Sequence, residues 1–374
     1  MMRGLQQGLV EPGLARRVRL VARLAETFET SAQAGTATGP LSGQALAEET
    51  GSSRAAVHKH IEQLRSCGFH IESTPGVGYR LVAPFDDLLA GEAVLFFLAR
   101  VQNGVLPRAG LPYVYRAHCE STNRLLREMV SAGDPPAGTT VAADHQTKGR
   151  GRLDRVWRDQ SGRDLTFSVL LRPSLNPGQA HLLSLAAALA VAEAVEEHSA
   201  LRAPLGIKWP NDVVAEGRKL CGILLEGSMD VDRLQWAIAG VGLNVNSDCS
   251  EVANLIEGED EGGLDGRPAP ISLRDLSTEV PRAPLLAAVL VRLAQRWAEL
   301  DGATGAERIL AGLRERDVLL GRPLEVFGTG TEGGTVVLGE GAGLGSEGQL
   351  LVRAPRGQVV AVFAGDVTLR RSRG

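Results

Sequence analysis

The chain has 374 residues but lacks the features that mark many specialised protein classes. Its four cysteines (Cys67, Cys119, Cys221 and Cys249) lie far apart without a Cys-x-x-Cys pair, which indicates reduced thiols in a cytoplasmic protein rather than disulfides or a zinc site. It has no uninterrupted apolar run long enough to span a bilayer and no secretory leader pattern, so no membrane partner is expected. Its net charge of -4 does not by itself indicate a nucleic-acid partner.

The length predicts two or three domains, the first covering residues 1–84. The pattern predicts, in order, a helix over 15–28, a polar loop over 31–40, helices over 42–51 and 53–65, and strands over 69–73 and 79–82. Ser52 or Ser53 is expected to cap the third helix. Two helices around a glycine turn, followed by a hairpin, are typical of a winged helix-turn-helix domain.

Residues 85–316 are expected to form an α/β (α+β) catalytic domain with a mixed sheet. Strands are predicted over 165–171, 222–225 and 236–241, helices over 181–197 and 284–300, and an exposed acidic loop over 257–270. Residues 317–374 are rich in Gly and Val. Short strands over 324–327, 335–338, 350–353, 359–363 and 367–369 predict a small SH3-like β-barrel there.

The segment Asp144-His-Gln-Thr-Lys-Gly-Arg-Gly-Arg-Leu-Asp-Arg-Val-Trp157 is the most informative part of the chain. Its glycines allow a tight turn close to a ligand, and its arginines suit phosphate and carboxylate groups. We expect the loop to fold over an anionic small molecule, with Trp157 closing over it. An exposed basic turn is the alternative. The segment lacks the Gly-Lys-Ser/Thr ending of a P-loop.

Two lysines follow in distinctive surroundings. Lys208 begins Lys-Trp-Pro-Asn-Asp212, which favours a phosphate contact for the lysine and a metal-facing carboxylate for Asp212, although Pro-Asn-Asp also makes ordinary turns. Lys219 precedes the apolar run 220–225, where it could neutralise a substrate carboxylate or act as a snorkelling surface lysine.

Two further segments carry weaker signals. Glu120-Ser-Thr-Asn123 precedes a predicted helix over 124–130, so it fits a helix N-cap and equally a polar ligand contact at a helix start. Gly240-Val-Gly-Leu-Asn-Val-Asn246 predicts a strand that ends in a close backbone approach.

The order and spacing of these motifs resemble the biotin protein ligases. Residues 53–65, the wing Pro75-Gly-Val-Gly-Tyr79 and the ending Gly365-Asp-Val-Thr-Leu-Arg370 resemble the bifunctional members, which also repress biotin-synthesis genes. The resemblance implies two half-reactions. Biotin and ATP, with Mg²⁺, give biotinyl-5′-AMP and pyrophosphate, and a lysine of a biotin carboxyl carrier protein (acetyl-CoA carboxylase) then takes the biotin. Cationic side chains lower the barrier between the two anions.

The resemblance also implies residue roles. Catalysis is assigned to Lys219, Arg150 and Lys208. Biotin is expected to contact Ser121, Thr122, Asn123, Gln146, Arg150, Gly151, Arg152, Lys219 and Gly222. ATP or the adenylate is expected to contact Arg150, Arg152, Trp157, Lys208, Asn211 and Asn244. Asp212 would face Mg²⁺. Asp154 departs from the family, where many members have glycine, but Asp tolerates left-handed backbone better than most residues.

The same resemblance favours operator DNA as a partner of residues 1–84, through Ser53, Arg54, His58 and Lys59. This segment carries nine Lys and Arg against seven Glu, a modest excess for DNA binding, and winged helices also serve as protein contacts. A homodimer is plausible for a repressor that binds a palindrome. The competing functions are a lipoate ligase, and a biotin-sensing repressor without turnover.

Overall fold

A computed structural model describes residues 10–35, 39–102, 109–199, 201–230, 233–250, 268–328 and 336–369. The chain divides into two compact units. The first comprises Met1–Tyr115 with Pro281–Val291, and the second comprises Arg116–Val280 with Arg292–Gly374. This division does not test the three domains expected from the sequence, whose boundaries remain predictions.

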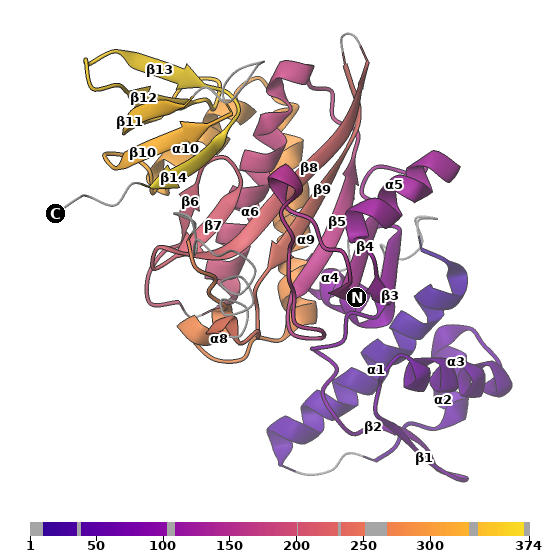
Figure 1. The fold of residues 1–374 in the computed structure, drawn as a ribbon. Coiled ribbons are helices and arrows are strands. Elements are labelled where there is room, and N and C mark those ends of the chain that lie inside the picture. Colours follow the sequence, from indigo (N-terminus) through magenta and orange to yellow (C-terminus); the bar gives the residue numbers. More distant parts are fainter. Residues whose placement is uncertain are drawn as a thin grey trace. The chain divides into compact units, whose positions relative to one another are not determined.

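The first unit contains the predicted helix-turn-helix elements in order (Figure 1). They are α1 (Pro12–Ala34), α2 (Gly43–Thr50), α3 (Arg54–Ser66), β1 (Ile71–Thr74) and β2 (Gly78–Leu81). Ser53 caps α3, since its hydroxyl accepts a hydrogen bond from the Ala56 amide at 3.1 Å. The polar loop predicted over 31–40 is wrong for its first part, because α1 continues to Ala34, while residues 36–38 lie outside the described residues.

Helix α4 (Gly91–Val101) of the same unit was not expected. Most of its residues are buried, so it lacks the polar face that makes a surface helix recognisable. It packs against α1, where Arg17 Nε lies 2.6 Å from Glu92 Oε1 and Glu92 is 4% exposed. A buried carboxylate of this kind is stable only while its partner stays in place.

The second unit is built on a seven-stranded mixed α/β sheet, as predicted, with strand order β3-β4-β5-β9-β8-β7-β6 (Figure 1). Its strands are β3 (Tyr113–Cys119), β4 (Thr140–Gln146), β5 (Leu165–Leu171), β6 (Gly206–Lys208), β7 (Asp212–Ala215), β8 (Arg218–Asp230) and β9 (Arg233–Leu243). All seven residues of β5 are buried, and burial of both faces explains why five of the seven are apolar. The long β8–β9 hairpin extends the predicted strands over 222–225 and 236–241 at both ends.

Two helices pack on this sheet, and further helices follow it in the chain. Helix α5 (Thr122–Ala132) packs on β4, β5 and β9, and α6 (His181–His198) packs on β6, β7, β8 and β9. The other helices are α8 (Leu273–Leu276), α9 (Arg282–Leu300) and α10 (Gly305–Glu315). Residues Pro177–His198 are long and apolar enough to cross a membrane by length and composition alone, but 78% of that apolar window is buried inside the protein, as in a core helix.

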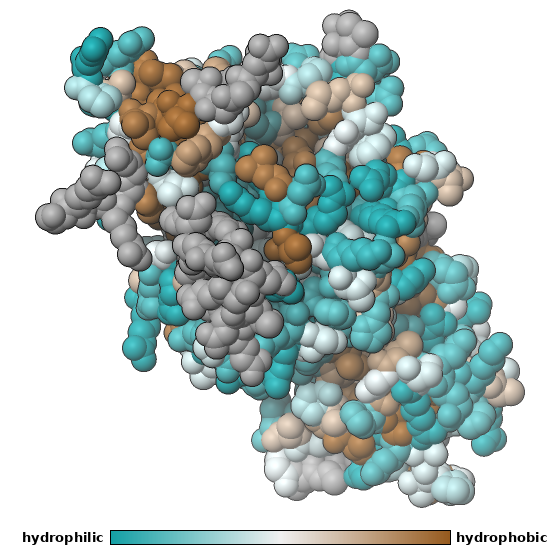
Figure 2. All heavy atoms as spheres, in the orientation of Figure 1, coloured by the Kyte–Doolittle hydropathy of each residue, from teal (hydrophilic) through white to brown (hydrophobic). Residues whose placement is uncertain are grey.

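A second sheet follows, with strand order β13-β12-β11-β10-β14 and every pairing antiparallel. Its strands are β10 (Pro323–Phe327), β11 (Val337–Leu344), β12 (Leu350–Arg353), β13 (Val359–Val362) and β14 (Asp366–Leu369). Residue 335 of the predicted strand over 335–338 lies outside the described residues. Figure 2 shows apolar side chains gathered on this part of the surface, where Phe327, Leu338, Val359 and Phe363 are exposed.

Candidate active site

A cavity of about 180 Å³ lies in the second unit and brings together the separate sequence motifs. The start of α5, the end of β4, the loop before β5, strands β6 to β9 and the start of β14 all contribute to it. Its lining includes every residue assigned above to biotin, ATP or metal, namely Ser121, Thr122, Asn123, Gln146, Arg150, Gly151, Arg152, Trp157, Lys208, Asn211, Asp212, Lys219, Gly222 and Asn244. The assigned roles themselves remain predictions.

The start of α5 forms a buried polar end of the cavity. The Thr122 amide and hydroxyl both donate to Gln146 Oε1, at 2.8 and 3.1 Å. Ser121 occupies the N-cap position, but its hydroxyl makes no capping hydrogen bond, so the cap expected from the sequence is correct in place only. Ser121, Thr122 and Asn123 are 3–5% exposed, and buried polar groups of this kind need fixed partners.

Two residues without a role assigned from the sequence hold this polar end in place. Ser168 of β5 is fully buried, and its Oγ lies 2.7 Å from Thr122 Oγ1 and 2.6 Å from Asn123 Oδ1. Glu226 of β8 accepts a hydrogen bond from Asn123 Nδ2 at 2.9 Å. The oxygen and the nitrogen of the Asn123 side-chain amide therefore each have a partner, and this fixes the orientation of the amide.

The glycine-arginine loop is a compact turn that closes on itself. The Trp157 amide donates to Gly149 O at 3.0 Å, and the Gly151 amide donates to Arg155 O at 2.7 Å. Leu153 and Asp154 adopt left-handed backbone, with φ of 55° and 56°. Asp154 thus occupies a conformation that glycine adopts freely, as the tolerance of Asp for that region predicts.

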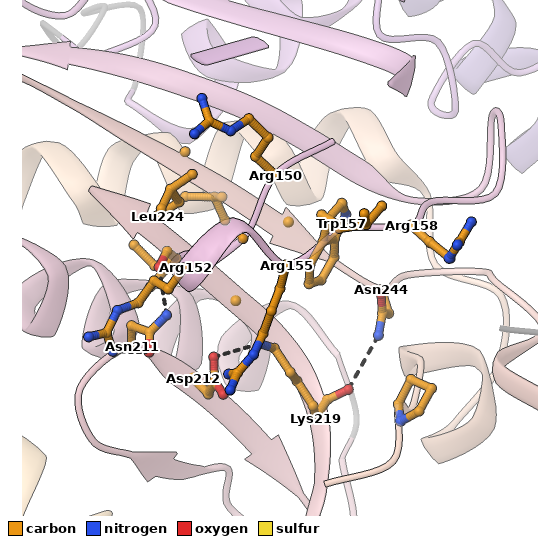
Figure 3. Close-up of a pocket in the computed structure, with 18 of the residues that line it drawn as sticks. Arg150, Arg152, Arg155, Trp157, Arg158, Asn211, Asp212, Lys219, Leu224 and Asn244 are labelled. Atoms are coloured by element: carbon orange, nitrogen blue, oxygen red, sulfur yellow. Dashed lines mark hydrogen bonds and ion pairs between the residues drawn. The ribbon is translucent and has the colours of Figure 1, made fainter. Parts of the chain in front are cut away.

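Trp157 packs on the sheet where glycine leaves room for it (Figure 3). A Cβ on Gly242 would lie 2.8 Å from Trp157 Cδ2 and still closer to two other ring atoms, and a Cβ on Gly222 would lie 3.2 Å from Cζ3. The Lys219 ammonium lies 5.8 Å from the indole centroid, within reach of a cation–π contact. The close backbone approach predicted at Gly240–Asn246 is confirmed, and it seats this ring and Asn123.

The arginines of the loop point in different directions. Figure 3 shows Arg152 and Arg155 directed toward Asn211, Asp212 and Lys219, and Arg150 directed away from them. Arg152 donates to Asn211 Oδ1 at 3.3 Å and to Gly365 O at 3.0 Å. Arg150 instead lies 3.5–3.6 Å from the carboxylates of Asp154 and Glu226. The structure therefore favours Arg152 over Arg150 for a contact near Lys219.

Arg155 was quoted in the motif without a role, and the structure places it in the cavity. Its Nη2 lies 2.5 Å from Asp366 Oδ2, so the loop is joined to the first residue of β14. Burial raises the pKa of the Asp366 carboxyl. The hydrogen bond and the charge of Arg155 lower this pKa, and their effect together with that of nearby cations is larger, so the pKa lies below its usual range.

Lys219 and Asp212 form the charged centre of the cavity. Lys219 Nζ lies 2.8 Å from Asp212 Oδ1, and these side chains are 30% and 14% exposed. Asn244 Nδ2 donates to the Lys219 carbonyl at 3.3 Å and to Ile271 O at 3.0 Å, so it fastens the backbone that carries the lysine. Asn211 Nδ2 donates to Ile223 O at 2.7 Å, which leaves its carbonyl for Arg152.

Lys208 is 8% exposed, and burial lowers the pKa of its ammonium, with Asp212 acting in the opposite direction. Within the described residues its side chain makes no hydrogen bond or ion pair. An unpaired buried ammonium is costly, which favours a site that receives an anionic ligand.

The residues assigned to DNA lie in the first unit. Arg54, His58 and Lys59 are exposed on α3, as predicted from their place off its apolar stripe, while Val57, Ile61 and Leu64 are buried. Ser53 is also exposed, and its hydroxyl is used by the cap.

Comparisons with known proteins identify the family to which this fold and site belong. The description "Biotin/lipoate A/B protein ligase family" matches residues 115–244, and "HTH domain" matches residues 36–80. The biotin--[acetyl-CoA-carboxylase] ligase of Mycobacterium tuberculosis is 34% identical over 254 residues, which cover 67% of this chain and 86% of that protein. The chain belongs to the biotin protein ligase family.

Two further comparisons agree with this assignment. The bifunctional ligase/repressor BirA of Bacillus subtilis is 37% identical over 206 residues, 55% of this chain, and the match spans 60% of that relative's length. The solved structure of the Aquifex aeolicus biotin protein ligase in complex with biotin and ATP is 29% identical, with a TM-score of 0.55 over 70% of this chain and 99% of that one.

Proposed function

We propose that this protein activates biotin with ATP and transfers it to a lysine of a biotin carboxyl carrier protein. The observation that carries the proposal is the cavity in which a fixed polar end, at Thr122 and Asn123, leads under Trp157 to the Lys219–Asp212 pair. The ureido ring of biotin suits the polar end, and its carboxylate then reaches the lysine. The carrier is proposed from the name of the mycobacterial relative.

In the first half-reaction an oxygen of the biotin carboxylate attacks the α-phosphorus of ATP. Both groups are anionic, so cationic side chains must offset their repulsion. Lys219 neutralises the carboxylate and Arg152 contacts the α-phosphate, while Lys208 receives the phosphates that leave. Asp212 keeps the Lys219 ammonium inside the cavity at 2.8 Å until the substrates arrive.

The loop then protects the mixed anhydride from water. Trp157 covers the glycine backbone of β8 and β9, and Arg152 and Arg155 tie the loop to Gly365 and Asp366. In the second half-reaction the carrier's lysine amine attacks the anhydride carbonyl. AMP leaves, and the amine gives up a proton.

Mg²⁺ is proposed as part of the MgATP substrate. Among the described residues no group of three or more His, Cys, Asp or Glu side chains could hold a metal by itself. Mg²⁺ commonly takes one or two carboxylates together with substrate phosphates, and Asp212 fits the part of that single carboxylate. When bound, the ion neutralises phosphate charge.

The test is ATP-dependent labelling of a purified biotin carrier domain with biotin, with lipoate as the control acid. Lys219→Ala should abolish adenylate formation, whereas Lys148→Ala, an exposed lysine whose side chain is 68% accessible, should leave it unchanged. Labelling with lipoate alone would make the protein a lipoate ligase. Bound biotin without labelling would make it a biotin sensor.

We also propose that the first unit binds operator DNA and makes repression responsive to biotin. Exposed Arg54, His58 and Lys59 on α3, with Ser53 at its start, support this, as does the ligase/repressor name of the Bacillus relative. A homodimer would match a palindromic operator. Sedimentation with and without biotin and ATP measures that dimer, and a monomer on operator DNA would refute it.

The finer assignments belong to the same proposal. The antiparallel five-stranded sheet over 323–369 supports an SH3-like barrel, and the four free cysteines support a cytoplasmic location. The proposed domains are residues 1–84, 85–316 and 317–374.

A further inference from the structure

A second cavity lies beside the first in the same unit, and of its described lining residues only Lys208 has an assigned ligand. Its described lining is apolar or cationic, consisting of Lys208, Val214, Gly217, Pro268, Val318, Arg322 and Leu369. Lys208 and Pro268 also line the first cavity, so the two are neighbours around the buried lysine. These residues come from β6, β7 and the turn after it, the segment before α8, the segment before β10, and β14.

The charge in this second cavity is of one sign. Lys208 and Arg322 are its charged residues, and no carboxylate is among its described lining. Asp317 lies next to Val318 in sequence, but its Oδ1 accepts from the Leu319 amide at 2.8 Å and the residue is not part of the lining. In the first cavity, by contrast, Lys219 and Arg155 are already paired with Asp212 and Asp366.

The two cations of the second cavity differ in exposure, since Arg322 is exposed and Lys208 is 8% exposed. The Arg322 backbone is fixed at both ends, because its amide donates to Leu319 O at 3.1 Å and its carbonyl accepts from the Gly341 amide at 2.9 Å. Within the described part of the chain, neither the Arg322 guanidinium nor the Lys208 ammonium has a hydrogen bond or ion pair. Polar groups placed like this on anchored backbone fit an anion that carries several charges.

We propose that this second cavity binds the pyrophosphate end of ATP, and then the pyrophosphate product, through Arg322 and Lys208. The inference rests on the proposed adenylation. In that step a bond forms between the carboxylate oxygen and the α-phosphorus, and the bond from the α-phosphorus to the bridging oxygen breaks. The electron pair leaves with pyrophosphate, and no proton is transferred. The attacking and leaving oxygens lie roughly in line, so the leaving group departs on the side away from the carboxylate.

Lys208 lines both cavities, so one lysine can contact both parts of a bound ATP. At the boundary it can contact the bridging region of the polyphosphate, while Arg322 holds the far phosphate. A guanidinium suits that far position, because its fork can bind two phosphate oxygens at once.

The experiment measures the reverse half-reaction on the full-length protein, with inorganic pyrophosphate as the probe. Biotinyl-5′-AMP and pyrophosphate are supplied, and ATP formation is followed. Arg322→Met keeps an apolar stem but removes the charge. It should raise the KM for pyrophosphate by about tenfold or more, the typical effect of losing a charge-assisted contact. The KM for ATP should rise with it, while biotin affinity stays within about twofold of wild type.

The matched control is Arg356→Met, which removes the same charge from an exposed arginine in the turn between β12 and β13. It should leave every constant unchanged. Unfolding midpoints check that both variants remain folded, and Arg322→Glu should weaken pyrophosphate binding more than Arg322→Met does.

The outcomes separate this inference from the proposed function. Normal carrier labelling with an unchanged KM for pyrophosphate in Arg322→Met would overturn the pyrophosphate site and leave the ligase intact. No adenylate formation in wild type would overturn the proposed function instead. Pyrophosphate binding can then still be measured directly by calorimetry, where equal affinity in wild type and Arg322→Met would also overturn the site.

Discussion

Gly242→Ala should disable the site by displacing Trp157, without disturbing the sheet. The new Cβ would lie 2.8 Å from Trp157 Cδ2 and nearer to two other ring atoms, whereas carbon atoms in contact are about 3.5–4.0 Å apart. The backbone of β9 is held by β5 and β8 on either side, so the indole must move by about 1 Å or more. A misplacement of that size in a reacting site costs about 10²-fold in rate, or about 2.7 kcal/mol.

The assay is pyrophosphate release with biotin and ATP, reported as kcat/KM. The control is Gly133→Ala, since Gly133 has φ of -170° and a methyl group added there would have no neighbouring atom within 4 Å. A double-mutant cycle with Trp157→Ala isolates the clash, because without the ring the methyl group has nothing to displace. If Gly242→Ala lowers kcat/KM equally with and without Trp157, the steric reasoning is wrong.

Three further predictions concern charged groups. Asp366→Asn weakens the partly exposed pair with Arg155, so biotinyl-5′-AMP should leave about two- to fivefold faster in a chase experiment, and an unchanged release rate would contradict this. Burial lowers the pKa of Lys208, so it loses its proton at a lower pH than an ordinary lysine. The KM for ATP should therefore rise on the alkaline side, and Lys208→Arg should flatten that rise in a pH series. Arg54→Ala and Lys59→Ala should each weaken operator binding and reduce its dependence on salt by about one ion, measured by titration at several salt concentrations.

The sequence was most informative where burial imposes a simple pattern. Strand β5 was predicted to the residue over 165–171 because both of its faces are covered and five of its seven residues are apolar. Strand β3 was missed because its seven residues are half-buried or exposed, which leaves no alternation to detect. Helix α4 was missed for the opposite reason, since an apolar helix without a polar face resembles any other apolar run.

In the site, groups of neighbouring residues could be recognised from the sequence, whereas contacts between distant residues could not. Each motif occurs within a few residues, so its glycines, arginines and lysines could be recognised together. The Arg155–Asp366 pair joins residues 211 positions apart, and no spacing rule connects them. Ser168 lies within a mostly apolar strand, and only the fold shows that its hydroxyl faces Thr122 and Asn123.

The balance of forces in the glycine-arginine loop suggests why it can both close over an adenylate and release it. Leu153 and Asp154 hold left-handed backbone, which costs roughly 1–2 kcal/mol for an ordinary residue and less for Asp. The contacts of Arg152 with Gly365 and of Arg155 with Asp366 are partly exposed, so each contributes about 1 kcal/mol or less. These two terms are therefore of similar size, and the packing of Trp157 on the sheet adds to the closed form of the loop. A bound phosphate adds charge-assisted contacts of about 1.5–3 kcal/mol each, so the ligand itself decides whether the loop stays closed.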